Sequence, residues 1–171
     1  MKTLLISGSP RNGNTDFILS QLNDKIGNSE LILLRNKNIN HCKGCLNCHI
    51  TECPIDDDMK EISKKLIDSD LVIIGTPNYF DNVSGLLKDF IDRTNRLHQI
   101  EALRNKRLIL IMVAGGRIDG TKKYLDLTMS GFVRYHELKL IGSYAFSALN
   151  PDDLRNDKEA IEKINDILRL I

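Results

Sequence analysis

Residues 8–15 read Gly-Ser-Pro-Arg-Asn-Gly-Asn-Thr and join a short apolar segment to a segment with helical periodicity. The apolar segment, residues 3–7, is continuous, which is typical of a strand buried in a parallel sheet. After the stretch, Leu19, Leu22 and Ile26 recur at the spacing of one helix face. Residues 8–15 are therefore expected to link a buried strand to an amphipathic helix.

Four side chains of this strand-to-helix turn suit an anion. Ser9, Asn14 and Thr15 are short hydrogen-bond donors, and Arg11 carries a permanent positive charge. Asn14 or Thr15 is also placed to cap the helix, whose N-terminal N–H groups attract anions. Asn14 stands where a nucleoside-triphosphate loop has lysine, and the dinucleotide pattern of glycines is absent. The turn is expected to bind one terminal phosphate; the alternative is an ordinary strand-to-helix turn.

Length and charge limit the possible classes of protein. The chain has 171 residues, the size of one domain, and a formal net charge of +1. That charge gives no electrostatic basis for binding nucleic acid or an anionic membrane, and no apolar segment has the length of a membrane span. Met1 leads directly into the first predicted strand, so no signal peptide is expected. We predict a cytoplasmic protein with reduced thiols.

Strands and helices alternate along the chain. Strands are expected at residues 3–7, 30–35, 71–75, 107–113 and 138–144. One helix is expected to start near residues 56–58, with Met59, Ile62 and Leu66 on its inner face, and another to cover residues 122–133. The last is expected to open at residues 150–153, with Leu154, Ile161, Ile164 and Leu168 facing inward. This alternation indicates an α/β fold in one domain, residues 1–171, with a parallel sheet covered on both faces.

Two further loops at the carboxyl ends of predicted strands carry unusual residues. Thr76-Pro77-Asn78-Tyr79-Phe80 follows the third strand, and Ala114-Gly115-Gly116 follows the fourth. In open parallel sheets, ligands bind beyond the carboxyl ends of the strands. Together with residues 8–15, these loops predict a ligand site at that edge.

All four cysteines lie in a loop, residues 41–55, inserted after the second strand. Cys42, Cys45 and Cys48 are three residues apart, and Cys53 is followed by proline, which resembles an iron–sulfur ligand run. A zinc site is an alternative, since histidines at positions 41 and 49 flank the run. Unligated thiols, or a labile disulfide, are the third interpretation.

As a set, these motifs resemble the NADPH-dependent FMN reductase and iron–sulfur flavoprotein family. The resemblance is carried by Gly8-Ser9-Pro10-Arg11-x-Gly13-Asn14-Thr15, Cys42-x2-Cys45-x2-Cys48-x4-Cys53-x3-Asp57-Asp58-Met59, Thr76-Pro77-x-Tyr79 and Lys88-x-Phe90-x-Asp92-Arg93. It implies a flavodoxin-like three-layer sandwich with strand order 2-1-3-4-5 and bound FMN. It also implies a homodimer or a dimer of dimers, to which Asp92 and Arg93 are expected to contribute polar contacts.

The resemblance also assigns site residues. It implies that the FMN phosphate lies on Ser9, Arg11, Asn14 and Thr15. It implies that Pro77, Asn78, Tyr79 and Phe80 meet the isoalloxazine ring, and that Ala114, Gly115 and Gly116 form a third wall, where small residues let the backbone approach the flavin. In iron–sulfur members of the family such cysteines hold a [4Fe–4S] cluster, which here would need Cys42, Cys45, Cys48 and Cys53.

The function predicted from these residues is an FMN-dependent oxidoreductase. Electrons would pass from a reduced donor, NAD(P)H or a ferredoxin-type protein, through the flavin to a small-molecule or protein acceptor. No catalytic side chain is assigned, because the flavin itself would carry the chemistry. The alternatives are a cluster-free NAD(P)H:FMN or quinone reductase, and a flavodoxin-like electron carrier or binding protein without small-substrate turnover.

Overall fold

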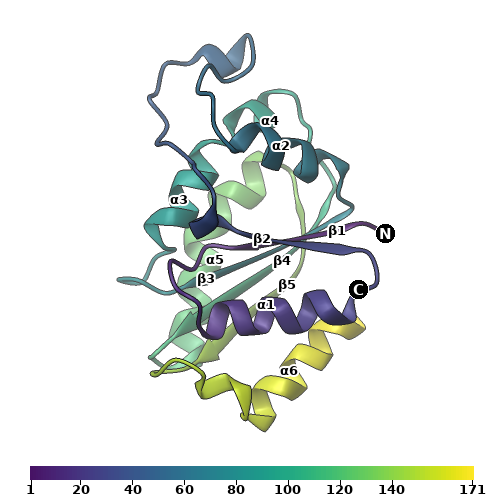
Figure 1. The fold of residues 1–171 in the computed structure, drawn as a ribbon, viewed down its shortest axis with the longest axis vertical. Coiled ribbons are helices and arrows are strands. Elements are labelled where there is room, and N and C mark those ends of the chain that lie inside the picture. Colours follow the sequence, from purple (N-terminus) through teal and green to yellow (C-terminus); the bar gives the residue numbers. More distant parts are fainter.

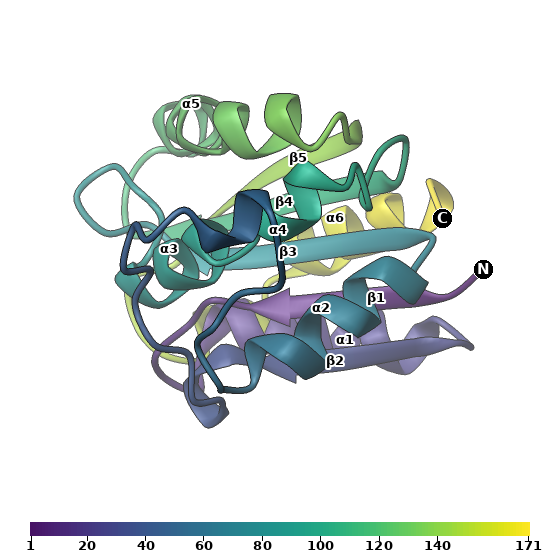
Figure 2. The same cartoon turned by 90° about the horizontal axis from the view of Figure 1, so that it is seen from above.

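The computed structural model describes residues 1–171 and contains one five-stranded sheet. Its strands are β1 (Thr3–Ser7), β2 (Ser29–Leu33), β3 (Leu71–Pro77), β4 (Arg107–Ala114) and β5 (Lys139–Ser147). All pair in parallel in the order β2-β1-β3-β4-β5, as Figure 2 shows from above. The predicted flavodoxin-like topology is therefore confirmed.

Helices cover both faces of the sheet. They are α1 (Asn14–Lys25), α2 (Met59–Asp68), α3 (Gly85–Asp92), α4 (Asn95–Gln99), α5 (Ile118–Tyr135) and α6 (Lys158–Arg169). One core lies between the sheet and α2, α3, α4 and α5, and a second lies between the sheet and α1 and α6. Figure 1 shows α1 and α6 together below the sheet, with α2, α3 and α4 above it.

Alternation along β1 explains the two cores. Leu4 and Ile6 face the α2–α5 layer, whereas Leu5 faces α1 and α6, and all three are fully or almost fully buried. The inner strands β1, β3 and β4 are covered on both faces, which is why their segments are buried along almost their whole length. None of the helices is both long and apolar enough to cross a membrane.

The C-terminal part differs from the prediction. β5 continues to Ser147, three residues beyond the expected end, and α6 begins only at Lys158. Asp157 caps α6 by accepting the N–H groups of Glu159 and Ala160. Ala160, Ile164 and Ile167 form the buried face of α6, so Ile164 is buried as expected, whereas Ile161 is exposed.

A long segment without regular strands runs from residue 37 to residue 58, between β2 and α2. Apart from one short 3-10 turn, Asn47–His49, it has no secondary structure. In Figure 1 its outer part stands away from the body of the molecule, above α2 and α4. We call its cysteine-bearing part, residues 41–55, the cysteine loop.

Candidate functional site

The turn between β1 and α1 leaves backbone donors open at the start of a helix. Gly13, in extended conformation, is the N-cap of α1, and no side chain caps the helix, so the predicted capping role of Asn14 or Thr15 is wrong. The first intrahelical bond is donated by Phe17 N–H to the Gly13 carbonyl, 2.9 Å. The N–H groups before it have no backbone acceptor, which makes this N-terminus a site for an anion.

Arg11 lies over this turn. A Cβ added at Gly13 would lie 3.7 Å from Arg11 Nε, and the exposed guanidinium makes no ion pair within the chain. Ser9 is buried, and its hydroxyl donates to the Arg11 carbonyl at 2.7 Å. Thr15, in the first turn of α1, is also buried. The turn thus has a free cation and free N–H donors, whereas the Ser9 hydroxyl already has an acceptor.

Asn14 connects this turn to the segment after β5. Its Nδ2 donates to the Asn150 carbonyl at 2.7 Å, and its Oδ1 accepts the Leu154 N–H at 3.3 Å. One of its two amide hydrogens remains for a ligand. Asn14 therefore has a positioning role that the sequence did not reveal.

The negative charge of a buried carboxylate close to the anion site is compensated by an arginine. Asp16, in the first turn of α1, accepts from Ser7 Oγ and from Arg35 Nη1, both at 2.5 Å. Without these partners its charge would repel a phosphate at the helix N-terminus. Ser7 and Arg35 escaped the sequence analysis because only the fold brings them to Asp16.

The loop after β3 forms the next wall. Asn78 N–H donates to the Val113 carbonyl at 2.8 Å, and its side-chain oxygen is buried without a hydrogen-bond partner. Such an unpartnered buried oxygen is costly unless a ligand donates to it. Tyr79 is partly exposed, whereas Phe80, with φ of 52°, is fully exposed.

Hydrogen bonds fix the loops relative to one another. Ser84 Oγ, at the start of α3, donates to the Gly8 carbonyl at 2.6 Å. Glycine is required at position 8 because an added Cβ would lie 2.7 Å from Leu87 Cβ. Ala148 N–H donates to the Ala114 carbonyl at 2.8 Å and joins the ends of β4 and β5.

These loops enclose a cavity of about 130 Å³ at the carboxyl edge of the sheet. Nine predicted residues line it: Ser9, Arg11, Asn14, Thr15, Pro77, Asn78, Tyr79, Ala114 and Gly115. Phe80 and Gly116 were expected there but do not line it. Val113, Ala148 and Leu149 also line it but were not predicted; the last two follow β5, which extends three residues beyond its expected end.

The donors and acceptors of this cavity fit FMN. The uncapped helix and Arg11 suit its phosphate, and the unpartnered oxygen of Asn78 suits an N–H donor such as the flavin ring provides. The volume is below the 300–1,000 Å³ typical of small-molecule sites, so only part of FMN fits inside. The rest would extend over the exposed loop that carries Tyr79.

The cysteines lie elsewhere. Cys42 and Cys45 are exposed, Cys48 and Cys53 are half-buried, and all four are free thiols. Cys48 Sγ accepts a hydrogen bond from Asn95 Nδ2 at 3.0 Å. No group of three or more His, Cys, Asp or Glu side chains is arranged to hold a metal ion. In this conformation the four thiols therefore do not fit an iron–sulfur cluster.

A buried ion pair closes the base of the cysteine loop. Arg93, at the end of α3, contacts Asp57 through Nη1 at 2.6 Å and Nη2 at 3.0 Å, and Nη1 also donates to the Asn40 carbonyl at 2.7 Å. Both side chains are essentially inaccessible to solvent. Burial raises the pKa of Asp57, but hydrogen bonds from Arg93 and from Asn40 and Met59 N–H outweigh it, so the pKa is about 2.

The Asp57–Arg93 pair bears on the interface expected between chains. Arg93 was expected to contribute to an interface between chains, but its guanidinium is buried within this chain. The neighbouring Asp92 pairs with Lys88 on the same helix at 2.6 Å. Both residues thus have partners within this chain, and their contribution to an interface stays a prediction.

Comparisons with known proteins agree with this geometry. Residues 1–150 match the family described as "NADPH-dependent FMN reductase". An iron–sulfur flavoprotein of Methanocaldococcus jannaschii is 32% identical, over 100% of this chain and 99% of the relative. One of Archaeoglobus fulgidus is 34% identical, over 75% of this chain and 66% of the relative. The structure of an FMN-dependent NADH-azoreductase of Bacillus anthracis, in complex with FMN, has a TM-score of 0.69 at 15% identity, covering 99% of this chain and 98% of that one; this likeness concerns the fold alone.

Fold, site and family together define a flavin-dependent oxidoreductase. The chain belongs to the family of NADPH-dependent FMN reductases and iron–sulfur flavoproteins.

Proposed function

We propose that this protein passes electrons from a reduced donor, NAD(P)H or a ferredoxin-type protein, through FMN to a small-molecule or protein acceptor. The observation that carries the proposal is the cavity at the carboxyl edge, which joins an uncapped helix N-terminus, a free arginine and an unpartnered amide oxygen. When bound, FMN supplies the electron-transfer chemistry, and the protein supplies binding and orientation.

We assign the binding roles by donor type. Arg11, Thr15 and the first N–H groups of α1 would hold the phosphate, with the remaining amide hydrogen of Asn14. Asn78 would accept a hydrogen bond from the flavin ring, and Ala114 with Gly115 would let backbone approach it. The Asp16–Arg35 pair would keep the phosphate region free of unpaired negative charge.

We further propose that Cys42, Cys45, Cys48 and Cys53 ligate one [4Fe–4S] cluster. The support is their spacing, their confinement to one loop, and relatives named iron–sulfur flavoproteins that cover the chain. Because the thiols do not converge in the present conformation, ligation requires the cysteine loop to fold around the cluster. A reducing cytoplasm, in which we place the protein, would keep the thiols available.

We also propose that two chains associate over the flavin cavity. The cavity holds only part of FMN, and two of its lining residues, Tyr79 and Leu149, are exposed. Phe80, next to Tyr79 in the chain, is fully exposed as well. Exposed apolar groups of this kind are stabilised when a partner covers them. Light scattering should show a dimer or dimer of dimers at micromolar concentration, and Phe80→Asp should shift it toward monomer. An FMN-bound, active monomer would refute the association.

Anaerobic purification tests the proposed function. We expect a yellow protein with about one FMN per chain, about four irons per chain, and oxidation of NAD(P)H or of a reduced ferredoxin in the presence of an acceptor. FMN with turnover but no iron would favour the cluster-free reductase. FMN without turnover of any donor would favour an electron carrier.

A further inference from the structure

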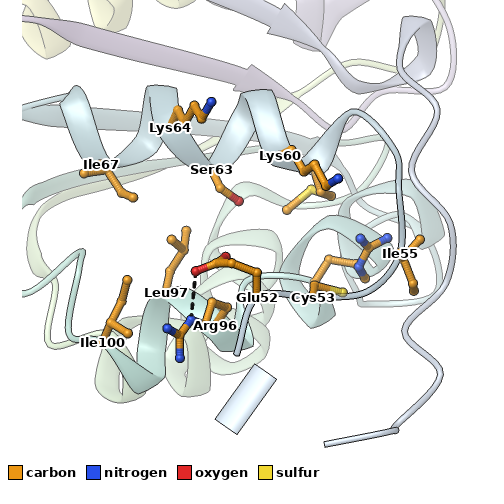
Figure 3. A pocket seen from close by; sticks show the side chains of 12 residues that line it. Glu52, Cys53, Ile55, Lys60, Ser63, Lys64, Ile67, Arg96, Leu97 and Ile100 are labelled. Carbon is orange, nitrogen blue, oxygen red and sulfur yellow. Dashed lines mark hydrogen bonds and ion pairs between the residues drawn. The ribbon is translucent and has the colours of Figure 1, made fainter. Parts of the chain in front are cut away.

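A second cavity, of about 370 Å³, lies between α2, α4 and the cysteine loop, and it shares no residue with the flavin cavity (Figure 3). Five apolar side chains line it: Ile55, Met59, Ile67, Leu97 and Ile100. Its volume is within the range typical of small-molecule sites. Met59 and Leu97 are buried at its floor, whereas Ile67 and Ile100 are exposed at its edge. The cavity therefore offers an apolar surface to a ligand.

The charged residues of this cavity are mostly cations. Lys60, Lys64, Arg93 and Arg96 line it, against one carboxylate, that of Glu52. Lys60 is paired with Asp56 outside the lining, and Lys64 forms no ion pair or hydrogen bond within the chain. Lys64 is thus the one cation of the lining without an acidic partner, since Arg93 pairs with Asp57 and Arg96 with Glu52. An apolar floor with this free cation at its edge suits an organic anion.

Glu52 shows how an anion can sit here. Its side chain extends from the cysteine loop into the space between α2 and α4, where its carboxylate contacts Arg96 Nε at 3.2 Å (Figure 3). The Glu52 side chain is 81% exposed, so little packing holds it there. A carboxylate arriving from solvent can therefore replace it on Arg96 at small cost.

The wall beside Cys53 carries an unsatisfied donor. Arg93 is buried, and its Nε has no hydrogen-bond partner. Burial alone would lower the pKa of its guanidinium, but Asp57 and, more weakly, Cys53 outweigh this effect. The pKa is therefore raised, and the group stays charged. Because Asp57 compensates the Arg93 charge, the group offers an unpartnered N–H donor beside this wall rather than an unpaired charge.

We propose that this cavity binds an amphipathic organic anion, a carboxylate carried on an aromatic or short aliphatic body. The body packs between Ile67 and Ile100 over the apolar floor. The carboxylate takes the place of Glu52 on Arg96, close to Lys64. This site is additional to the flavin cavity, but its lining includes Cys53, which is also a proposed cluster ligand.

The test uses 2-naphthoate as the probe. The control ligand is 2-naphthamide, which has nearly the same shape but no charge. The full chain is saturated with FMN so that neither probe can enter the flavin cavity. Methyl NMR of isotope-labelled isoleucine follows Ile55, Ile67 and Ile100. We expect saturable shifts of these methyls with naphthoate and at least tenfold weaker binding of naphthamide.

Three variants test whether each charged side chain strengthens or weakens naphthoate binding. Arg96→Gln should weaken naphthoate binding about tenfold and Lys64→Gln about threefold, with naphthamide unaffected. Glu52→Gln should instead tighten naphthoate binding about threefold, because it removes the competing carboxylate. A merely structural role for Glu52 would not strengthen binding when the side chain is neutralised.

Several results would overturn the proposal. Equal binding of naphthoate and naphthamide would exclude anion recognition, as would unchanged affinity in both Arg96→Gln and Glu52→Gln. Shifts confined to methyls outside the cavity would place the probe elsewhere. Methyl shifts that depend on protein concentration and block naphthoate would identify the cavity as a contact between copies of the chain.

Discussion

The flavin cavity and the cysteine loop both follow carboxyl ends of strands, but they are attached to the fold in different ways. The flavin-side loops are short and joined by hydrogen bonds such as Ser84 to Gly8 and Asn14 to Asn150. The cysteine loop is long, and its thiol-bearing part is largely exposed beyond a base closed by Asp57 and Arg93. The sheet thus shapes the cavity at its carboxyl edge without ligand, whereas the side chains of the cysteine loop do not converge on a metal site in this conformation.

The largest expected effect is loss of the proposed cluster without loss of FMN. Replacing any one of the four cysteines with Ala should abolish the cluster, because four thiolates are needed, while FMN stays bound at its separate cavity. Iron and sulfide analysis after anaerobic purification, with flavin absorbance on the same sample, measures both. The matched control is His49→Ala, which should retain iron. One stoichiometric zinc, or four titratable thiols without iron after reconstitution, would contradict the cluster.

The next effect tests the base of the loop. Asp57→Asn leaves a buried Arg93 guanidinium without its counter-charge and should lower the free energy of unfolding by about 3–5 kcal/mol. Denaturant unfolding of the full chain measures this. Asp58→Asn is the control, since Asp58 accepts only the Asn38 N–H at 2.7 Å in an exposed position; its cost should be about 1 kcal/mol. Equal effects of the two variants would contradict a special role for Asp57.

The same pair predicts a pH dependence. The pKa of Asp57 falls from the ordinary 3.8 to about 2 on folding, so the folded state binds this proton less readily than the unfolded chain. Its stabilisation is therefore complete above pH ~4 and lost as pH falls toward about 2. The stability difference between wild type and Asp57→Asn should shrink over this interval. A difference that is constant from pH 6 to roughly 2 would refute the assignment.

A smaller effect tests the flavin side. Arg11→Ala and Thr15→Val should each weaken FMN binding by about 1.5–3 kcal/mol, through loss of a charged hydrogen bond to the phosphate. Valine keeps the methyl group that packs near Gly75, so a change in fold is not expected. Flavin fluorescence titration gives the affinities, and riboflavin, which lacks the phosphate, is the control ligand. Unchanged FMN affinity in both variants would refute the phosphate assignment.

The parts predicted correctly from sequence are those that depend on local pattern. Apolar continuity located β1 and β3, and helical spacing located Met59, Ile62 and Leu66 on α2. Small and polar residues at strand ends located most of the residues that line the cavity at the carboxyl edge. These features are fixed by neighbours in sequence, so the pattern contains them.

The parts that were missed depend on contacts between distant residues. Asp153 was read as opening a helix, but its carboxylate accepts the Leu149 and Asn150 N–H groups, and Asp157 caps α6 instead. The pairing of Arg93 with Asp57, 36 residues away, was not predicted, because nothing in the local sequence indicates it. Pairings of this kind follow from the fold and cannot be read from spacing alone.

The smallest expected effect comes from a comparison of Asp92 and Arg93, which are neighbours at the end of α3. Asp92 pairs with Lys88 one turn earlier, and their side chains are 43% and 57% exposed, so solvent screens the pair. Asp92→Asn should therefore change the free energy of unfolding by about 0.5 kcal/mol or less. The matched variant is Arg93→Met, which keeps the aliphatic stem but leaves the buried Asp57 carboxylate unpaired and should cost several-fold more. Denaturant unfolding of both variants in one buffer gives the comparison. A cost for Asp92→Asn approaching that of Arg93→Met would mean that the cysteine loop is held by the whole end of α3 rather than by the Asp57–Arg93 pair.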